Sequence, residues 1–258
     1  MSGLYWEEAG EGPPVVLVHE AIGDRRMWEP QWQTFPRAHR TVRFDMRGFG
    51  ESAIGPGTYS HARDLVELLD EAGLERTSLV GGSLGGRVAL EVAVAQPDRI
   101  EKLVLMDPGG PGGDWSEETR AGWAEEEAAL ERGDLDAAVE VNLRMWVDGP
   151  HRSPEEVDQE VRELVAQMQR RSFELQLPVG EEADEELLVE ALGDRVGEVT
   201  APTLILTGDL DQPDILAIAD RLAREIPDAR RATIAGAAHA PSLERPEEFD
   251  RLVLEFLR

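Results

Sequence analysis

The sequence predicts an α/β fold, with a mostly parallel twisted sheet, helices on both faces and an inserted helical segment. Short apolar runs alternate with amphipathic helical stretches, which is typical of parallel strands linked by helices. This alternation stops between Asp107 and Thr203, where only helical patterns occur. The chain has 258 residues, of which 41% are hydrophobic and 31% charged, as expected for one large globular unit with an insertion.

Five continuous apolar runs have the character of buried parallel strands. They are VVLVH (15–19), TVRFD (41–45), TSLVG (77–81), KLVLMD (102–107) and TLILTG (203–208), and RRATIAG (230–236) is a weaker sixth. Apolar residues at helical spacing predict helices over residues 61–73, 213–227 and 247–258. Gly73 supplies the C-terminal stop of the first of these helices.

Residues 110–199 are predicted to form the helical insertion, and residues 1–109 and 200–258 the sheet-containing core. The insertion contains three helical stretches, over residues 116–133, 135–149 and 153–176. The loop GGPGG (109–113) leads into it and GEVTAP (197–202) leads out. It therefore lies between two strands of one sheet.

The composition excludes several classes of partner. The formal charge of −27 repels nucleic acid and anionic lipid, so neither is an expected partner. No apolar run approaches the roughly 20 residues that cross a bilayer. There is no cysteine and no N-terminal secretion signal in MSGLYWEEAGEG, which favours a cytoplasmic location. We expect a monomer or a homodimer.

Ser83 is the candidate nucleophile. The pattern G-x-S-x-G, formed here by Gly81, Ser83 and Gly85, lies between a predicted strand and a predicted helix. A serine at such a turn is lifted clear of the sheet, and flanking side chains would collide with neighbouring elements. A capping serine in a glycine-rich loop is the alternative interpretation, and the strand before and helix after Ser83 weigh against it.

A serine hydroxyl needs a base and an orienting acid to become a nucleophile. Of five histidines, His239 follows the last predicted strand and precedes the last helix, so it falls on the same sheet edge as Ser83. Asp211, in the turn after residues 203–208, is the favoured acid, and Asp107, one strand earlier, is its rival. Asp209 suits a local loop hydrogen bond, and Asp214 a helix N-terminal charge.

Four stretches resemble the α/β-hydrolase superfamily over nearly the whole chain. They are VLVHEAIGDRRMW, FDMRGFGES, LVGGSLGG and the pair GDLD and AGAAH. The resemblance is closest to small cap-bearing esterases, enol-lactonases and carbon–carbon bond hydrolases. It implies an eight-stranded sheet, with the usual first strand shortened or absent here, and it makes residues 110–199 a cap over the nucleophile.

The resemblance also implies an oxyanion hole formed by the backbone N–H groups of Leu84 and Ala21. Relatives generally have His-Gly where this chain has His19-Glu20. A carboxylate there would oppose a developing negative charge, so we expect Glu20 to point away from the hole. Its expected partner is one of Arg25, Arg26 and Arg87, and His19 is expected to be structural.

No cofactor or metal is expected. Gly48 and Gly50 follow a strand as in a dinucleotide-binding fingerprint, but the next segment, AIGPGTYS, is not helical. No histidine–carboxylate cluster has metal-ligand spacing. The sequence therefore favours a cofactor-independent serine hydrolase acting on a small carboxylic ester or lactone.

Two alternatives remain open at this point: a hydrolase that cleaves a carbon–carbon bond of a diketone with the same triad, and a slow or non-catalytic ligand receptor. Glu20 is the feature that keeps the receptor interpretation open. Trp28, Met145 and Trp146 are predicted to line the substrate pocket, although Met145 and Trp146 fit core positions at least as well.

Overall fold

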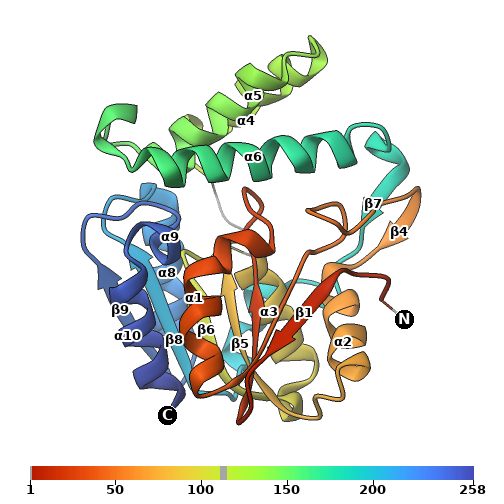
Figure 1. Ribbon diagram of the computed structural model, residues 1–258, viewed down its shortest axis with the longest axis vertical. Helices are drawn as coiled ribbons and strands as arrows, with labels where there is room; N and C mark the ends of the chain where they lie inside the picture. The colour runs from red at the N-terminus through yellow and green to blue at the C-terminus, as the bar shows by residue number, and fades with distance from the viewer. Residues whose placement is uncertain (1, 111–114) are drawn as a thin grey trace.

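The computed structural model describes residues 2–110 and 115–258, and a seven-stranded sheet lies at its centre (Figure 1). The strand order is β1 (Trp6–Ala9), β3 (Arg40–Phe44), β2 (Pro14–Val18), β5 (Thr77–Gly82), β6 (Ile100–Met106), β8 (Thr203–Gly208) and β9 (Ala229–Ile234). Only β1 runs antiparallel to its neighbour; the other pairs are parallel. The predicted mostly parallel sheet is confirmed, including the weak strand β9. The resemblance implied eight strands, and the sheet has seven within the described residues.

The two faces of the sheet bury different side chains because successive residues of a strand point in opposite directions. Val15 and Leu17 of β2 pack on one face, and Val16 and Val18 on the other. The first face is covered by α1 (Glu29–Thr34), α9 (Pro241–Glu244) and α10 (Pro246–Leu257), and the second by α2 (His61–Glu71), α3 (Leu84–Ala95) and α8 (Pro213–Glu225). Helices α2, α8 and α10 lie where apolar spacing predicted them.

The insertion forms a layer of helices above the carboxyl ends of the strands (Figure 1). It contains α4 (Glu117–Glu131), α5 (Leu135–Asn142), a π-helical turn over Leu143–Asp148, and α6 (Gln159–Gln176). Among the described residues of the chain, every helix is too short or too polar to span a bilayer.

One expectation about the insertion is wrong, because the structure contains a strand within it. Strand β7 (Ala183–Glu185) pairs in parallel with β4 (Gly57–Tyr59) outside the main sheet. Its sequence, Ala-Asp-Glu, is too short and too polar to give the apolar pattern of a strand. The strand forms only because this segment pairs with β4, which is distant in the chain. The division of the chain at residues 110 and 199 remains a prediction. Val189, Leu192 and Val196 near the end of the insertion pack on the same face as α3 and α8.

Candidate active site

Ser83 lies at the sharp turn between β5 and α3. Its backbone has φ +47° and ψ −112°, a strained conformation for a residue with a side chain. The flanking glycines are required by space. A Cβ on Gly81 would overlap the backbone of Gly85, and a Cβ on Gly85 would overlap the carbonyl groups of Val18 and His19.

The structure brings Ser83, His239 and Asp211 together from three separate loops. His239 Nε2 lies 2.9 Å from Ser83 Oγ, and His239 Nδ1 lies 2.8 Å from Asp211 Oδ2. His239 and Asp211 are buried. Burial alone would lower the pKa of His239, but the charge of Asp211 and its hydrogen bond outweigh this and raise that pKa above its ordinary value. The imidazole is thereby fixed between an alcohol and an acid.

The rival acid, Asp107, also lies in this cluster but does not take the position next to the imidazole. It follows β6 with φ +41°, and its Oδ1 accepts a hydrogen bond of 3.0 Å from the Gly208 N–H. Burial, the charge of Asp211 and a hydrogen bond to Asp211 together raise the pKa of Asp107 well above its ordinary value. A protonated Asp107 can therefore donate its proton to the Asp211 carboxylate.

The other two acids near β8 have separate partners. Asp209 Oδ1 accepts a 2.6 Å hydrogen bond from the Gly236 N–H, the local loop bond expected from the sequence. Asp214, in the first turn of α8, also accepts hydrogen bonds from the hydroxyl groups of Ser116 and Thr119 at the start of α4. This second role of Asp214, which ties the insertion to the core, was not predicted.

The same cluster contains the donor set that would suit a metal ion. One potential ligand atom from each of Asp107, Asp211 and His239 lies within 4.8 Å of the other two. However, the His239 Nδ1 and Asp211 Oδ2 atoms already face each other at 2.8 Å. A proton shared along these groups accounts for the arrangement without an ion.

Glu20 does not point toward an arginine, and that expectation is wrong. Arg25 pairs with Asp45, Arg26 with Asp24, and Arg87 with Glu91 and Glu185. The Glu20 side chain turns inward instead, where it is only 1% exposed. A Cβ on Gly82 would lie 2.8 Å from Glu20 Cγ, so the missing side chain of Gly82 makes room for the carboxyl group.

The buried Glu20 carboxyl is held as an uncharged acid. Its Oε1 has no hydrogen-bond partner among the described residues. Burial raises the pKa of Glu20 to about 8, although the charge of His239 opposes this. A neutral carboxyl does not oppose a negative charge developing beside Ser83, which removes the conflict inferred from the sequence.

His19 has a structural position at the end of β2. Its Nε2 accepts a 2.9 Å hydrogen bond from the Met46 N–H, and its Nδ1 donates to the Glu20 carbonyl oxygen at 2.7 Å. Burial lowers the pKa of His19, so the ring stays neutral. It connects the loop after β2 to the loop after β3.

A cavity of about 570 Å³ lies between the insertion and the sheet, and Ser83 and His239 open into it. Leu84, which follows Ser83 in the chain, and Ala21 carry the predicted oxyanion N–H groups, and both residues line this cavity. Trp146 also lines it, with its ring 4.7 Å from the His239 ring.

Two predicted pocket residues do not line the cavity. Trp28 is completely buried and packs against Phe249 at a ring distance of 6.0 Å. The Met145 side chain packs toward Gly122 instead, and its carbonyl oxygen accepts a 2.6 Å hydrogen bond from Gln212. The apolar character of these side chains predicted burial correctly, but burial in the core and burial in a pocket give the same pattern in sequence.

Several polar lining residues were not predicted. Those from the insertion helices are Glu126, Asn142, Gln169, Ser172 and Gln176, and those from the core include Arg47, Tyr59, His61 and Arg87. Burial, reinforced by the charge of Arg87, lowers the pKa of His61 to about 3, so this ring is neutral. The spacing of Gln169, Ser172, Phe173 and Gln176 places them on one face of α6, and this is the signal that the sequence offered.

Comparisons with known proteins agree with the observed fold. A family model described as alpha/beta hydrolase fold matches residues 13–246. The 2-hydroxy-6-oxononadienedioate/2-hydroxy-6-oxononatrienedioate hydrolase of Cupriavidus pinatubonensis is 30% identical, over 98% of this chain and 90% of its own. The 3-oxoadipate enol-lactonase 1 of Acinetobacter baylyi is 23% identical, over 96% and 90%. A thermophilic esterase from Thermogutta terrifontis, solved with malate bound, is 30% identical with a TM-score of 0.80, over 99% of this chain and 93% of that one.

Proposed function

This chain belongs to the alpha/beta hydrolase fold family. We propose that it hydrolyses a small carboxylic ester or lactone without a cofactor, with Ser83 as the nucleophile. The observation that carries the proposal is the continuous hydrogen-bonded line from Ser83 Oγ through His239 to Asp211, with contacts of 2.9 and 2.8 Å. Both distances lie within the range needed for a nucleophile, its base and the orienting acid.

In the proposed reaction, His239 Nε2 takes the proton of Ser83 as Oγ forms a bond to the substrate carbonyl carbon. The resulting oxyanion accepts hydrogen bonds from the backbone N–H groups of Leu84 and Ala21. The protonated imidazole, stabilised by Asp211, then gives its proton to the leaving alkoxide, which leaves an acyl-enzyme. Water activated by His239 attacks the acyl carbon and releases the acid and the free serine.

Carbon–carbon bond cleavage of a diketone is the second candidate, because a named relative at 30% identity is a hydrolase of an oxo-dienedioate. The same triad would serve it after a proton transfer within the substrate. A slow receptor is the third candidate, and the neutral state of Glu20 removes the main reason for it. The cytoplasmic location and the monomeric or homodimeric state stay predictions.

The test compares the protein with its Ser83→Ala variant on chromogenic short-chain esters and on diketones. We expect kcat/KM for the esters to fall by a factor of about 10⁴ or more in Ser83→Ala, and a fluorophosphonate to form an adduct on Ser83. The matched control is Ser153→Ala, which changes an exposed serine of the insertion. An adduct with negligible turnover supports the receptor, and diketone cleavage well above ester cleavage supports the second candidate.

A further inference from the structure

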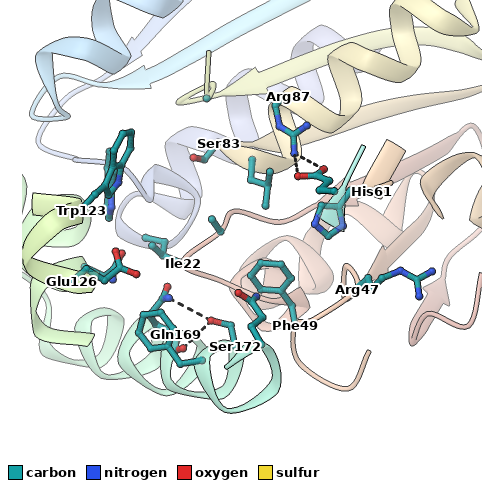
Figure 2. A pocket seen from close by; sticks show the side chains of 18 of the residues that line it. Ile22, Arg47, Phe49, His61, Ser83, Arg87, Trp123, Glu126, Gln169 and Ser172 are labelled. Atoms are coloured by element: carbon teal, nitrogen blue, oxygen red, sulfur yellow. Dashed lines mark hydrogen bonds and ion pairs between the residues drawn. The ribbon is translucent and has the colours of Figure 1, made fainter. Parts of the chain in front are cut away.

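The end of the cavity formed by the insertion is polar and largely buried. It is lined by Glu126 of α4, Asn142 of α5, and Gln169 and Ser172 of α6, together called the cap polar cluster. Asn142 and Gln169 are each 5% exposed and Ser172 is 1% exposed. Figure 2 shows Glu126, Gln169 and Ser172 on one side of the pocket and Arg47, His61 and Arg87 on the other.

Gln169 has hydrogen-bonding capacity that the protein does not use. Its Oε1 is buried without a partner in the described part of the chain. Its Nε2 makes one long contact of 3.4 Å with Ser172 Oγ, which itself donates to the Gln169 carbonyl oxygen at 2.8 Å. A buried amide oxygen without a hydrogen-bond partner is destabilising, so its place in the wall of the cavity needs a reason. A ligand group that completes its hydrogen bonds supplies one.

The charges around the cavity indicate which ligand group fits. Burial raises the pKa of Glu126, although a hydrogen bond from the Asn142 side chain acts to lower that pKa. The arginines that line the described part of the cavity are both engaged elsewhere, Arg47 with Asp64 at 2.7 Å and Arg87 with Glu91 and Glu185, each at 2.7 Å. A substrate carboxylate would thus meet the Glu126 carboxyl without a free cation beside it.

We propose that the cap polar cluster is a substrate subsite that binds an uncharged hydrogen-bond donor, a hydroxyl or amide N–H group. This subsite rests on the proposed function, because it places the donor on the ester or lactone that Ser83 attacks. Ile22, Trp123 and Trp146 line the same cavity and supply apolar surface. The substrate therefore carries a short apolar segment between its reacting carbonyl and its donor group.

The kinetic test uses matched esters of increasing chain length in which a terminal hydroxyl replaces a methyl group, on the acyl side in one set and on the alcohol side in another. We expect a preference in kcat/KM for the hydroxylated ester at one chain length, and the weakest activity for the corresponding carboxylate. Gln169→Met should reduce this preference about tenfold, the value of one hydrogen bond. Gln167→Met is the matched control on the same helix, because Gln167 lies on the exposed face of α6 and does not line the cavity.

The preference ratio should change less than about twofold in Gln167→Met. Glu126→Leu, at a half-buried position, is a second variant should Gln169→Met fail to fold, and it should lower the preference in the same direction. Equal losses for both esters in Gln169→Met, or no preference at any chain length in either set, would overturn the subsite.

A binding measurement separates this inference from the proposed function. In Ser83→Ala, tryptophan fluorescence reports binding, since Trp115, Trp123 and Trp146 line the cavity. Tighter binding of the hydroxylated ester, lost on adding Gln169→Met, supports the subsite even if the unmodified protein hydrolyses no ester. In that event the proposed function is refuted and the subsite is retained. Equal binding of both esters overturns the subsite whatever the activity.

Discussion

Replacing Glu20 by glutamine tests whether the carboxyl beside the candidate nucleophile is held as a neutral acid. Its surroundings raise its pKa from an ordinary value of 4.5 to about 8. Because the folded-state pKa is the higher one, the stabilising contribution is fully present below about pH 4.5 and is lost as the pH rises through about 8. Glu20→Gln mimics the neutral acid and removes this dependence.

The size of the effect follows from the two pKa values. The interval between about 4.5 and about 8 corresponds to roughly 5 kcal/mol of unfolding free energy across that pH window. Little of this is screened by solvent, because Glu20 is 1% exposed. The amide also fits the space beside Gly82, so the substitution should cause little steric change. An effect of this size is a large fraction of the net stability of a domain, which is about 5–15 kcal/mol.

The assay is urea unfolding of both proteins at about pH 5, 7 and 9, with the difference in unfolding free energy taken at each pH. We expect Glu20→Gln to gain stability relative to the unmodified protein as the pH rises, by several kcal/mol between about pH 5 and 9. Glu11→Gln, at an exposed carboxyl, is the control and should show a constant difference. Parallel curves for Glu20→Gln would show that this carboxyl ionises as it does in water.

Two further substitutions test the acids next to the imidazole. Asp107→Asn keeps an acceptor for the Gly208 N–H and a donor for Asp211, so it should lower the unfolding free energy in urea by about 1 kcal/mol or less. Asp107→Leu keeps neither group and should lower the unfolding free energy by about 2–3 kcal/mol. Similar losses in the two variants would mean that the hydrogen bonds of Asp107 do not contribute to stability. Asp211→Asn should move the His239 titration, followed by NMR of its imidazole, to lower pH, because burial then acts without the opposing carboxylate. An unchanged titration would assign the raised pKa to another group.

The main sheet and the meeting of Ser83, His239 and Asp211 could be predicted from the sequence because few local rules decide them. Parallel strands place their carboxyl ends on one edge, so residues that follow different strands in the chain meet there. The G-x-S-x-G pattern from Gly81 to Gly85 predicted a tight turn in which only small residues fit beside the serine. The backbone at Ser83 has the strained conformation of such a turn. Strand β7 escaped prediction because its three residues depend on a partner from another part of the chain.

Side-chain direction was the part that the sequence could not supply. Trp28 and Met145 are buried as expected, but a helical pattern does not tell whether a buried face meets the core or a cavity. The polar residues of α6 have the composition of a solvated helix surface, yet Gln169 and Ser172 face inward. Glu20 was placed toward arginines because a buried acid without a partner is rare, and the space left by Gly82 is visible only in three dimensions.

The choice among the acids around His239 is decided by the donors that each one meets. Asp211 accepts hydrogen bonds from the His239 Nδ1 and, at 2.7 Å, from the Gln212 N–H, so it is the carboxyl best placed to carry a negative charge. Asp107 accepts one backbone hydrogen bond, and Glu20 Oε1 meets none from the described residues. Burying three charged carboxyls together would be prohibitive, so the two acids with fewer donors keep their protons. One negative charge then remains beside the imidazole, as the proposed activation of Ser83 requires, and the departure from His-Gly to His19-Glu20 leaves that charge unchanged.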